Sequence, residues 1–268
     1  MTDSNKFKLR YISDIHLEFY HKSKKPLPTF IKSQPNEYLA LCGDIGNPLF
    51  PNYEEFLGQM SSQFIEVFLI SGNHEYYHVT SSKNKYTMNE IDSIIENICK
   101  RFPNIHYLNN KSIELKPNIT VAGTTLWSQI FENHEMIMKY HNDYRLIHTT
   151  TDKLLSINDT NKMNEKNRQW LESEIEKAQL HNRKLIIISH HMPSYCLIDK
   201  KYQNNWSNSA FSNHLDHLIK PPVVAWLYGH SHNYHHTIIN NVYCGINAVG
   251  YMEENTGYNT NETFEIES

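Results

Sequence analysis

The 268-residue sequence has no cysteine pair spaced as C-x-x-C, and its four cysteines, Cys42, Cys99, Cys196 and Cys244, stand far apart. This spacing argues against a zinc knuckle and against a disulfide framework. No apolar run approaches the roughly 18 to 20 residues that a membrane span needs. We therefore expect reduced cysteines, most of them in the core, no membrane partner, and a cytoplasmic or other reducing location.

Excess positive charge is also absent: 25 Lys and Arg stand against 29 Asp and Glu, and the formal net charge is -4. Proteins that bind nucleic acid non-specifically usually carry a basic field, so nucleic acid is a possible but unfavoured partner. A local phosphate site remains compatible with this charge. The length suits one large domain, and we expect residues 1–268 to form a single domain. The sequence does not indicate the oligomeric state.

Runs of β-branched and aromatic residues predict strands, and periodic apolar residues between them predict helices. The expected strands are 7–13, 38–42, 65–71, 113–115, 119–124, 185–189, 223–228, 237–239 and 242–246. The expected helices are 53–64, 89–102, 161–181 and 212–219. The asparagine-rich stretches 158–167 and 255–262 are expected to be solvated loops. This order indicates an α/β protein in which two mixed sheets pack together with helices outside.

Five of the predicted strands end in polar side chains that can bind a metal. In chain order these are Asp14 and His16, then Asp44, then Asn73, His74 and Glu75, then His190 and His191, and finally His230 and His232. Each cluster alone has an ordinary explanation as a turn or a partly buried histidine. A purely structural explanation does not account well for five such clusters at five strand ends. Because ligand sites in open α/β sheets form at the carboxyl ends of strands, we expect one site there.

The predicted donors are carboxylate, amide oxygen and imidazole, with no thiolate at ligand spacing. This set suits Mn, Fe, Zn, Ni or Co better than copper or an iron–sulfur cluster. The donors are too many for one tetrahedral zinc and suit two ions that share a carboxylate. Two such ions hold the attacking and departing oxygens of a phosphoryl displacement and lower the pKa of a bound water. The set therefore predicts a dinuclear hydrolase.

The motif series "DIH", "GD", "GNHE", "HH" followed by Pro193, and "GHSH" resembles that of the calcineurin-like metallophosphoesterase superfamily. The motifs span residues 14–232. The flanking text "AGTTLWS", "NDYRLI" and "GYMEENTGY" is similar to bacterial-type members that carry only a general phosphoesterase label. The resemblance implies a four-layer αββα sandwich.

The resemblance also implies roles for individual residues. The implied metal ligands are Asp14, His16 and His232 for the first ion, Asn73, His190 and His230 for the second, and Asp44 as the bridge. His74 would act on the phosphate as general acid or charge stabiliser, and His191 would lie outside the ligand set. A hydroxide that bridges the two ions would be the nucleophile.

The sequence departs from the phosphoprotein phosphatases of this superfamily. They carry Asp-Arg-Gly after the second motif and an Arg before "GNHE", whereas this chain has "GDIGNP" and Ser71. Without arginines to hold a dianionic phosphate, a phosphodiester or small nucleotide is the favoured substrate. A phosphomonoesterase or a nuclease of the same fold remains an alternative. A non-catalytic metal-binding scaffold is a further one, although such scaffolds generally lose ligands that this chain keeps.

Two other features could touch a substrate. The segment 195–214 carries Tyr195, Tyr202, Trp206 and Phe211, whose rings could stack on a nucleobase. Packing of this segment on its own aromatic side chains is the favoured alternative. Arg145 is a candidate phosphate-side cation, with a surface salt bridge as the ordinary explanation.

Overall fold

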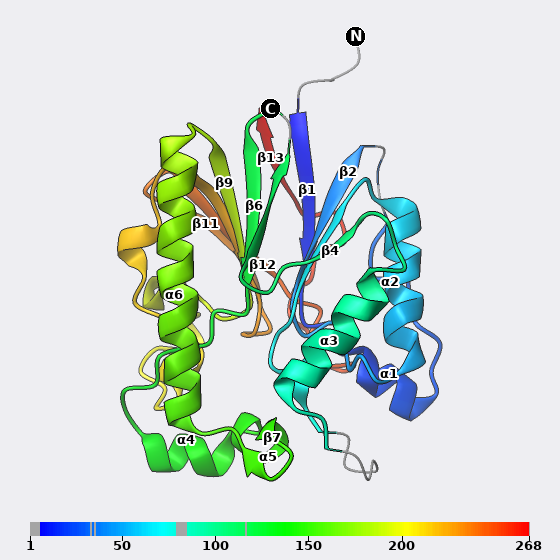
Figure 1. Cartoon of the computed structure of the whole chain (residues 1–268), viewed down its shortest axis with the longest axis vertical. Helices are drawn as coiled ribbons and strands as arrows, with labels where there is room; N and C mark the ends of the chain where they lie inside the picture. The colour runs from blue at the N-terminus through cyan, green and yellow to red at the C-terminus, as the bar shows by residue number, and fades with distance from the viewer. Residues whose placement is uncertain (1–5, 33, 35, 79–84, 116, 268) are drawn as a thin grey trace.

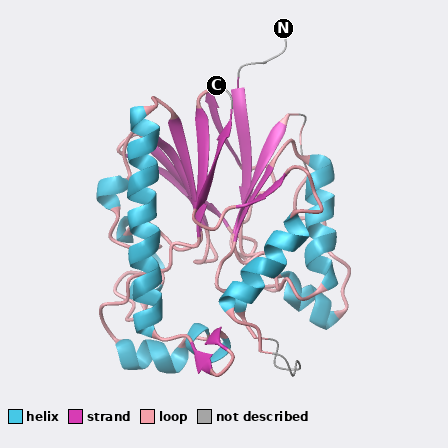
Figure 2. Cartoon of the chain, in the orientation of Figure 1, coloured by secondary structure: helices cyan, strands magenta, loops and turns pink. Residues whose placement is uncertain are grey.

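The computed structural model describes residues 6–32, 34, 36–78, 85–115 and 117–267. Two large mixed β-sheets pack face to face, and helices cover the outer face of each (Figure 1). Figure 2 shows the strands in the middle layers and the long helices on the two flanks. The expected four-layer αββα sandwich of the α/β class is thus confirmed.

The first sheet has the strand order β13-β1-β2-β3-β4. Its strands are β1 (Lys6–Ile12), β2 (Glu37–Cys42), β3 (Val67–Ile70), β4 (Ile105–Tyr107) and β13 (Thr263–Glu267). The neighbours from β1 to β4 are parallel, and β13 pairs antiparallel with β1. The carboxyl ends of β1, β2 and β3 therefore lie at one edge of this sheet.

The second sheet has the order β11-β12-β10-β9-β6-β5. Its strands are β5 (Lys111–Leu115), β6 (Ile119–Thr124), β9 (Lys184–Ser189), β10 (Val223–Tyr228), β11 (Tyr234–Ile239) and β12 (Val242–Asn247). The central strands β6, β9, β10 and β12 are parallel, and the two edge strands are antiparallel to their neighbours. A separate ribbon pairs β7 (His148–Thr150) with β8 (Lys153–Leu154).

Alternation along the strands builds three apolar layers. In β2, Ala40 and Cys42 face the second sheet, whereas Leu39 and Leu41 pack toward the helices. The helices on this side are α1 (Leu17–Ser23), α2 (Pro51–Gln63) and α3 (Met88–Cys99). On the other flank, α6 (Ile157–Leu180) packs on the second sheet through Leu171. Because successive strand residues point to opposite faces, one strand serves two cores.

The remaining elements are short. They are α4 (His134–Tyr140), α5 (Asp143–Leu146), and the 3₁₀ turns η1 (His74–Tyr76), η2 (Tyr195–Leu197), η3 (Lys200–Tyr202), η4 (Asn208–Ala210) and η5 (Asp216–Leu218). Within the described ranges, no helix combines the length and apolar character required to cross a bilayer. All four cysteines are free, and three of them are buried, Cys196 being exposed.

All nine expected strands are present, and the helices expected at 53–64 and 89–102 correspond to α2 and α3 with ends shifted by one to three residues. The expected helix at 212–219 is wrong, because only η5 forms there. Its backbone N–H groups bond elsewhere: Asn213 N donates to Met192 O at 2.9 Å and Leu215 N to Pro193 O at 2.9 Å. Pairing with the preceding segment thus replaces helical hydrogen bonds.

The solvated loop expected at 158–167 is also wrong, because these residues form the first turns of α6. A capping box starts this helix: the side chains of Ser156 and Asp159 each accept a hydrogen bond from the other's backbone N–H. Asn164 is buried and donates to Trp127 O at 2.6 Å. Asn161, Asn164 and Asn167 therefore bond the helix to the loop that follows β6.

Candidate active site

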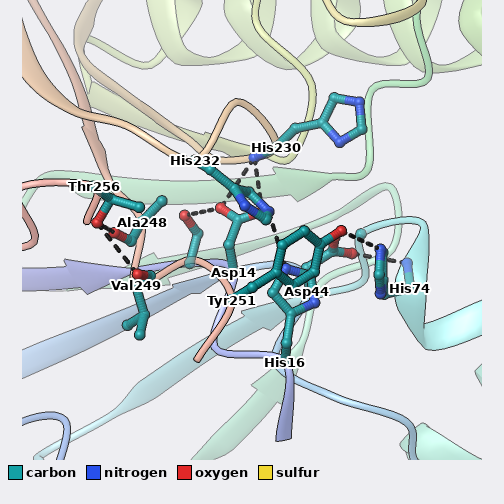
Figure 3. A network of polar contacts seen from close by, with 12 residues as sticks. Asp14, His16, Asp44, His74, His230, His232, Ala248, Val249, Tyr251 and Thr256 are labelled. Carbon is teal, nitrogen blue, oxygen red and sulfur yellow. Dashed lines mark hydrogen bonds and ion pairs between the residues drawn. The ribbon is translucent and has the colours of Figure 1, made fainter. Parts of the chain in front are cut away.

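Five strand ends meet at one edge of the sandwich. The loops after β1, β2, β3, β9 and β10 carry Asp14 and His16, Asp44, Asn73 and His74, His190, and His230 and His232 respectively. Five of these residues have positive φ, namely Asp14, His16, Asp44, His230 and His232. Left-handed backbone is uncommon for such residues and recurs at functional sites. It turns the loops after β1, β2 and β10 as soon as these strands end, so that Asp14, His16, Asp44 and His232 lie close together (Figure 3).

Close approach of the loops requires glycine in the "GD" and "GNHE" motifs. Gly43 has φ +84°, and a Cβ there would lie 2.6 Å from Nδ1 of His190 and 2.7 Å from Gly72 N. A Cβ on Gly72 would lie 2.7 Å from Asp44 N. Real side chains do not tolerate such distances, so the glycines let the ends of β2, β3 and β9 touch.

Asp14, His16 and His232 form the first donor group, with all three donor atoms within 4.8 Å of one another. Nε2 of His16 lies 3.0 Å from Nε2 of His232, and the latter lies 3.5 Å from Asp14 Oδ1. Both carboxylate oxygens of Asp14 accept from His230 N at 3.1 Å. Burial, followed by the neighbouring His74, lowers the pKa of His16. The lowered pKa favours the neutral imidazole, the form that binds a metal.

Asp44, His190 and His230 form the second donor group, again within 4.8 Å. His190 Nε2 lies 3.4 Å from Asp44 Oδ2 and 3.0 Å from Asn73 Oδ1, so the amide of Asn73 joins this group. Burial, and then the two neighbouring histidines, hold the pKa of His230 well below its usual value. The ring of His230 stacks on that of His191 at 4.2 Å.

Asp44 connects the two groups. Its carboxylate also lies within 4.8 Å of donor atoms of His16 and His74. Burial would raise the pKa of Asp44, but the neighbouring His190 and His74 hold it well below its usual value. Asp44 is therefore an ionised carboxylate with a donor group on each side.

The orientation of the side chains around His190 shows that the second group fits a cation. His190 Nδ1 donates to Cys42 O at 2.9 Å, which leaves Nε2 facing the oxygens of Asp44 and Asn73. Asn73 Nδ2 donates to Asp143 Oδ1 at 2.9 Å, so its oxygen is the atom that points inward. Only a proton or a cation satisfies three acceptors that meet at one point. Burial lowers the pKa of His190, but Asp44 raises it to about 10 overall, and the same negative field favours a metal ion.

The first group is oriented in a similar way. His232 Nδ1 contacts Glu254 Oε2 at 2.6 Å, and His16 Nδ1 contacts Glu18 Oε1 at 3.4 Å. Carboxylates behind ligand histidines fix the ring and direct the other nitrogen toward the metal. The donor chemistry of both groups therefore fits the expected Mn, Fe, Zn, Ni or Co ions.

His74 belongs to neither the first nor the second donor group but lies beside both. Its Nδ1 lies 2.9 Å from Glu18 Oε1, and its backbone N donates to Asp44 Oδ1 at 2.8 Å. Its Nε2 lies 3.5 Å from the hydroxyl of Tyr251. Burial lowers the pKa of His74, but the carboxylates of Asp44 and Glu18 raise it to about 9. This environment favours the protonated form of His74.

Several site residues escaped the sequence reasoning, namely Glu18, Asp143, Tyr251 and Glu254, and Glu75 was given no role. Glu75 is fully buried and accepts from the backbone N atoms of Gly72, Asp44, Ile45 and Gly46 at 2.7 to 3.4 Å. It thus holds the loops after β2 and β3 together. Their position in the sequence could have indicated them, because these residues lie within or beside the motifs and flanking stretches quoted above.

A cavity of about 330 Å³ opens beside the donor groups. Its lining includes Asp44, Asn73, His74, His230 and His232, together with residues of the segment 198–211. That segment therefore returns to the site, and Tyr202 and Phe211 line the cavity, Phe211 stacking on His230 at 4.5 Å.

Two of the four aromatic residues considered in the sequence lie elsewhere. Tyr195 stacks on His214 with ring centres 4.1 Å apart, and the ring centres of Trp206 and His141 lie 5.9 Å apart. Neither is among the described residues that line the cavity. Arg145 is exposed and hydrogen-bonds Asn142, and it also does not line the cavity. The segment thus combines both alternatives: part of it packs on its surroundings, and part faces the site.

Comparison with known proteins agrees with this geometry. Residues 7–234 match the calcineurin-like phosphoesterase family. The chain is 36% identical over 270 residues to the uncharacterized protein L509 of Acanthamoeba polyphaga mimivirus, with 94% of each chain covered.

Two solved structures share the fold. Phosphopantetheinyl hydrolase PptH from Mycobacterium tuberculosis superposes with a TM-score of 0.67 at 16% identity, covering 92% of this chain and 90% of that one. TT1561 of Thermus thermophilus superposes with a TM-score of 0.53 at 11% identity, covering 90% and 89%. The family match extends over most of the sequence and includes all five clustered strand ends. The chain therefore belongs to the calcineurin-like phosphoesterase family and is a metal-dependent phosphoester hydrolase.

Proposed function

We propose that the chain hydrolyses phosphodiesters or small nucleotides with two metal ions bound side by side. In this proposal Asp14, His16 and His232 hold one ion, Asn73, His190 and His230 hold the other, and Asp44 bridges them. The observation that carries the proposal is the position of Asp44, whose carboxylate lies within 4.8 Å of donors on both sides. Mn, Fe, Zn, Ni and Co are the candidate ions, because the donors are oxygen and imidazole nitrogen.

When bound, two such ions neutralise phosphate charge and make a water acidic enough to attack phosphorus near neutral pH. The chain's own residues orient the substrate and supply a proton to the departing oxygen. His74 directs Nε2 toward the cavity while Glu18 holds Nδ1 at 2.9 Å. A protonated imidazole at that place can donate a proton to the departing oxygen or stabilise the charge that develops on it.

A diester is preferred because Ser71 and the turn after Asp44, which replace the arginine-bearing text of the phosphoprotein phosphatases, serve structural purposes here. Ser71 is buried, and its hydroxyl lies 2.8 Å from that of Tyr107, away from the cavity lining. Asn47 bonds Tyr77 O at 3.0 Å and Leu49 N at 3.1 Å, which closes the turn after Asp44. A monoester dianion would carry one more charge without an arginine to pair with it.

The state of the cysteines bears on the cellular location of the protein. The four cysteines are free thiols, as expected in a reducing compartment, and we place the enzyme in the cytoplasm. Detection of a Cys42 disulfide or of secretion in the native cell would contradict this location.

Hydrolysis of bis(p-nitrophenyl) phosphate and of p-nitrophenyl phosphate by the Mn-loaded protein tests the reaction. We expect a higher kcat/KM for the diester, and loss of turnover in Asp44→Asn and in His74→Ala. His74→Ala should retain its bound metal, as measured by elemental analysis, whereas Asp44→Asn should lose part of it. Turnover that is independent of metal and of both substitutions would refute catalysis at this site. Faster hydrolysis of the monoester would instead favour a phosphomonoesterase.

A further inference from the structure

The cavity beside the donor groups has acidic walls. Besides Asp44, the carboxylates of Asp143, Asp199 and Glu254 line it. Among the lining residues within the described ranges, none is lysine or arginine. A phosphate bound anywhere other than at the metal centre would thus meet carboxylates and no side-chain cation of fixed charge.

These carboxylates are fixed in place by neutral groups or imidazole. Asp143 accepts from the hydroxyl of Tyr77 at 2.7 Å. Asp199 accepts from Asn233 Nδ2 at 3.1 Å and from the backbone N of Lys201 at 2.9 Å. The ammonium of Lys201 itself lies 4.8 Å from the centre of the Tyr202 ring, and Lys201 is not among the described lining residues. Among the described residues, no lysine or arginine side chain forms an ion pair with Asp199, whose carboxylate has an amide and a backbone N–H as partners.

Apart from the carboxylates and the histidines, the described residues that line the cavity are neutral. Asn205 and Ser207 supply amide and hydroxyl groups, and Met192, Ile198 and Phe211 supply an apolar surface. A cavity of about 330 Å³ with this lining lies near the lower end of the volumes used for small ligands. It suits one uncharged substituent with hydrogen-bonding groups and a flat or apolar part.

We propose that the cavity selects phosphodiesters with a single phosphorus and an uncharged polar substituent, and that Asp199 rejects substrates with additional phosphates. This inference rests on the proposed function, because the reacting phosphate must lie at the metal centre. The physical reason is electrostatic: an extra phosphate would be desolvated beside carboxylates without the Lys or Arg partners that phosphate recognition uses. Nucleoside polyphosphates and nucleic acids are then poor substrates, whereas diesters with one uncharged polar arm are good ones.

A matched pair of chromogenic diesters tests the inference. Thymidine 5′-(p-nitrophenyl phosphate) has one phosphorus, and its 3′-phosphorylated form adds a second charge at the far end of the nucleoside. Both release p-nitrophenolate, so one assay with the Mn-loaded enzyme serves both at the same ionic strength. We expect kcat/KM to be at least about tenfold lower for the 3′-phosphorylated compound, a difference that added salt reduces.

Substitution at Asp199 then identifies the responsible charge. Asp199→Lys should shrink the difference between the two substrates to about threefold or less, and Asp199→Asn should give an intermediate value. Asp152→Lys, an equal charge change at an exposed residue between β7 and β8, should leave the ratio as in the wild type. Equal hydrolysis of both diesters by the wild type, or a ratio that Asp199→Lys does not change, would overturn the inference and leave the proposed function standing. Failure to hydrolyse either compound with any of the candidate metals would overturn both.

Discussion

Nδ2 of Asn73 lies 2.9 Å from Asp143 Oδ1, and this contact decides which end of the Asn73 amide faces the donor groups. The inward end is Oδ1, 3.0 Å from His190 Nε2. A carboxylate from α5, far along the chain, thereby orients an amide at the end of β3. The relationship explains why the oxygen rather than the nitrogen of Asn73 faces His190.

Removal of this support should weaken metal binding at the second group. Asp143→Ala leaves the Asn73 amide free to turn, and we expect metal affinity and turnover to fall by about 10- to 100-fold. A competition titration of Mn against a chelator measures the affinity directly. Asp143→Asn, which keeps an oxygen acceptor, should lose less. An unchanged affinity in Asp143→Ala would show that Asn73 needs no such anchor.

Glu18 should affect both a metal ligand and His74, because its Oε1 contacts His16 Nδ1 at 3.4 Å and His74 Nδ1 at 2.9 Å. For Glu18→Ala we expect a fall in kcat of about 10- to 100-fold together with weaker binding at the first metal position. Steady-state kinetics over a range of Mn concentrations separates the two effects. If saturating Mn restores full kcat, Glu18 serves His16 alone.

Gly72→Ala should disable the site, since the new Cβ would meet the Asp44 backbone at 2.7 Å and press on its carboxylate. A displacement of Asp44 of the order of 1 Å is expected to cost about 100-fold in kcat/KM. Gly58→Ala in α2 is the matched control, because its Cβ would lie 3.3 Å from the ring of Phe102 and nowhere near the site. Wild-type activity in Gly72→Ala would contradict the close packing described here.

The metals should also stabilise the fold. Mn binds the folded donor groups in preference to the unfolded chain, so saturation at about 100 times Kd should add about 2.7 kcal/mol to the free energy of unfolding. Thermal melts with Mn and with EDTA measure the shift. Asp44→Asn should show a smaller shift than the wild type. An equal shift in both proteins would place the bound metal outside these groups.

A buried ion pair distant from the chemistry gives a separate test of stability. Arg10 and Glu37 are 3% and 4% exposed, with contacts of 2.8 Å and 2.7 Å between guanidinium and carboxylate. Glu37→Ala leaves a buried guanidinium without its anion, which we expect to lower the free energy of unfolding by about 3 to 5 kcal/mol. Urea denaturation checks this value. Glu265→Ala, which removes a surface pair with Lys6 and Lys8, should change stability by less than about 1 kcal/mol.

Local pattern in the sequence was sufficient to predict nine of the strands, the α/β class and the polar clusters that follow five strands, whereas β4, β7, β8 and β13 were not predicted. Strand periodicity fixes which residues are buried, and the residue types at each strand end indicate the chemistry. Asp14 and His16 could be paired from spacing alone, whereas spacing did not show that His230 and His232 belong to different donor groups. The resemblance to a family supplied the four-layer arrangement, which the structure confirms.

Other features depended on contacts between distant segments. The segment 212–219 reads as a helix, but its N–H groups pair with residues around Met192, and that partner is not visible from local propensity. The capping box of Ser156 and Asp159, by contrast, is a local signal that assigns 158–167 to α6, and the sequence reasoning overlooked it. Propensity is a weak guide wherever tertiary hydrogen bonds compete with it.

By itself, then, the sequence determined which side chains leave the strand ends, because strand geometry acts over a few neighbouring residues. Only the tertiary structure decided how those side chains are oriented. The carboxylates of Glu18, Asp143 and Glu254 reach their partners from other loops and from α1 and α5, and the walls of the cavity come from the segment around Asp199. Such orientation depends on distances between segments that become neighbours only when the two sheets pack.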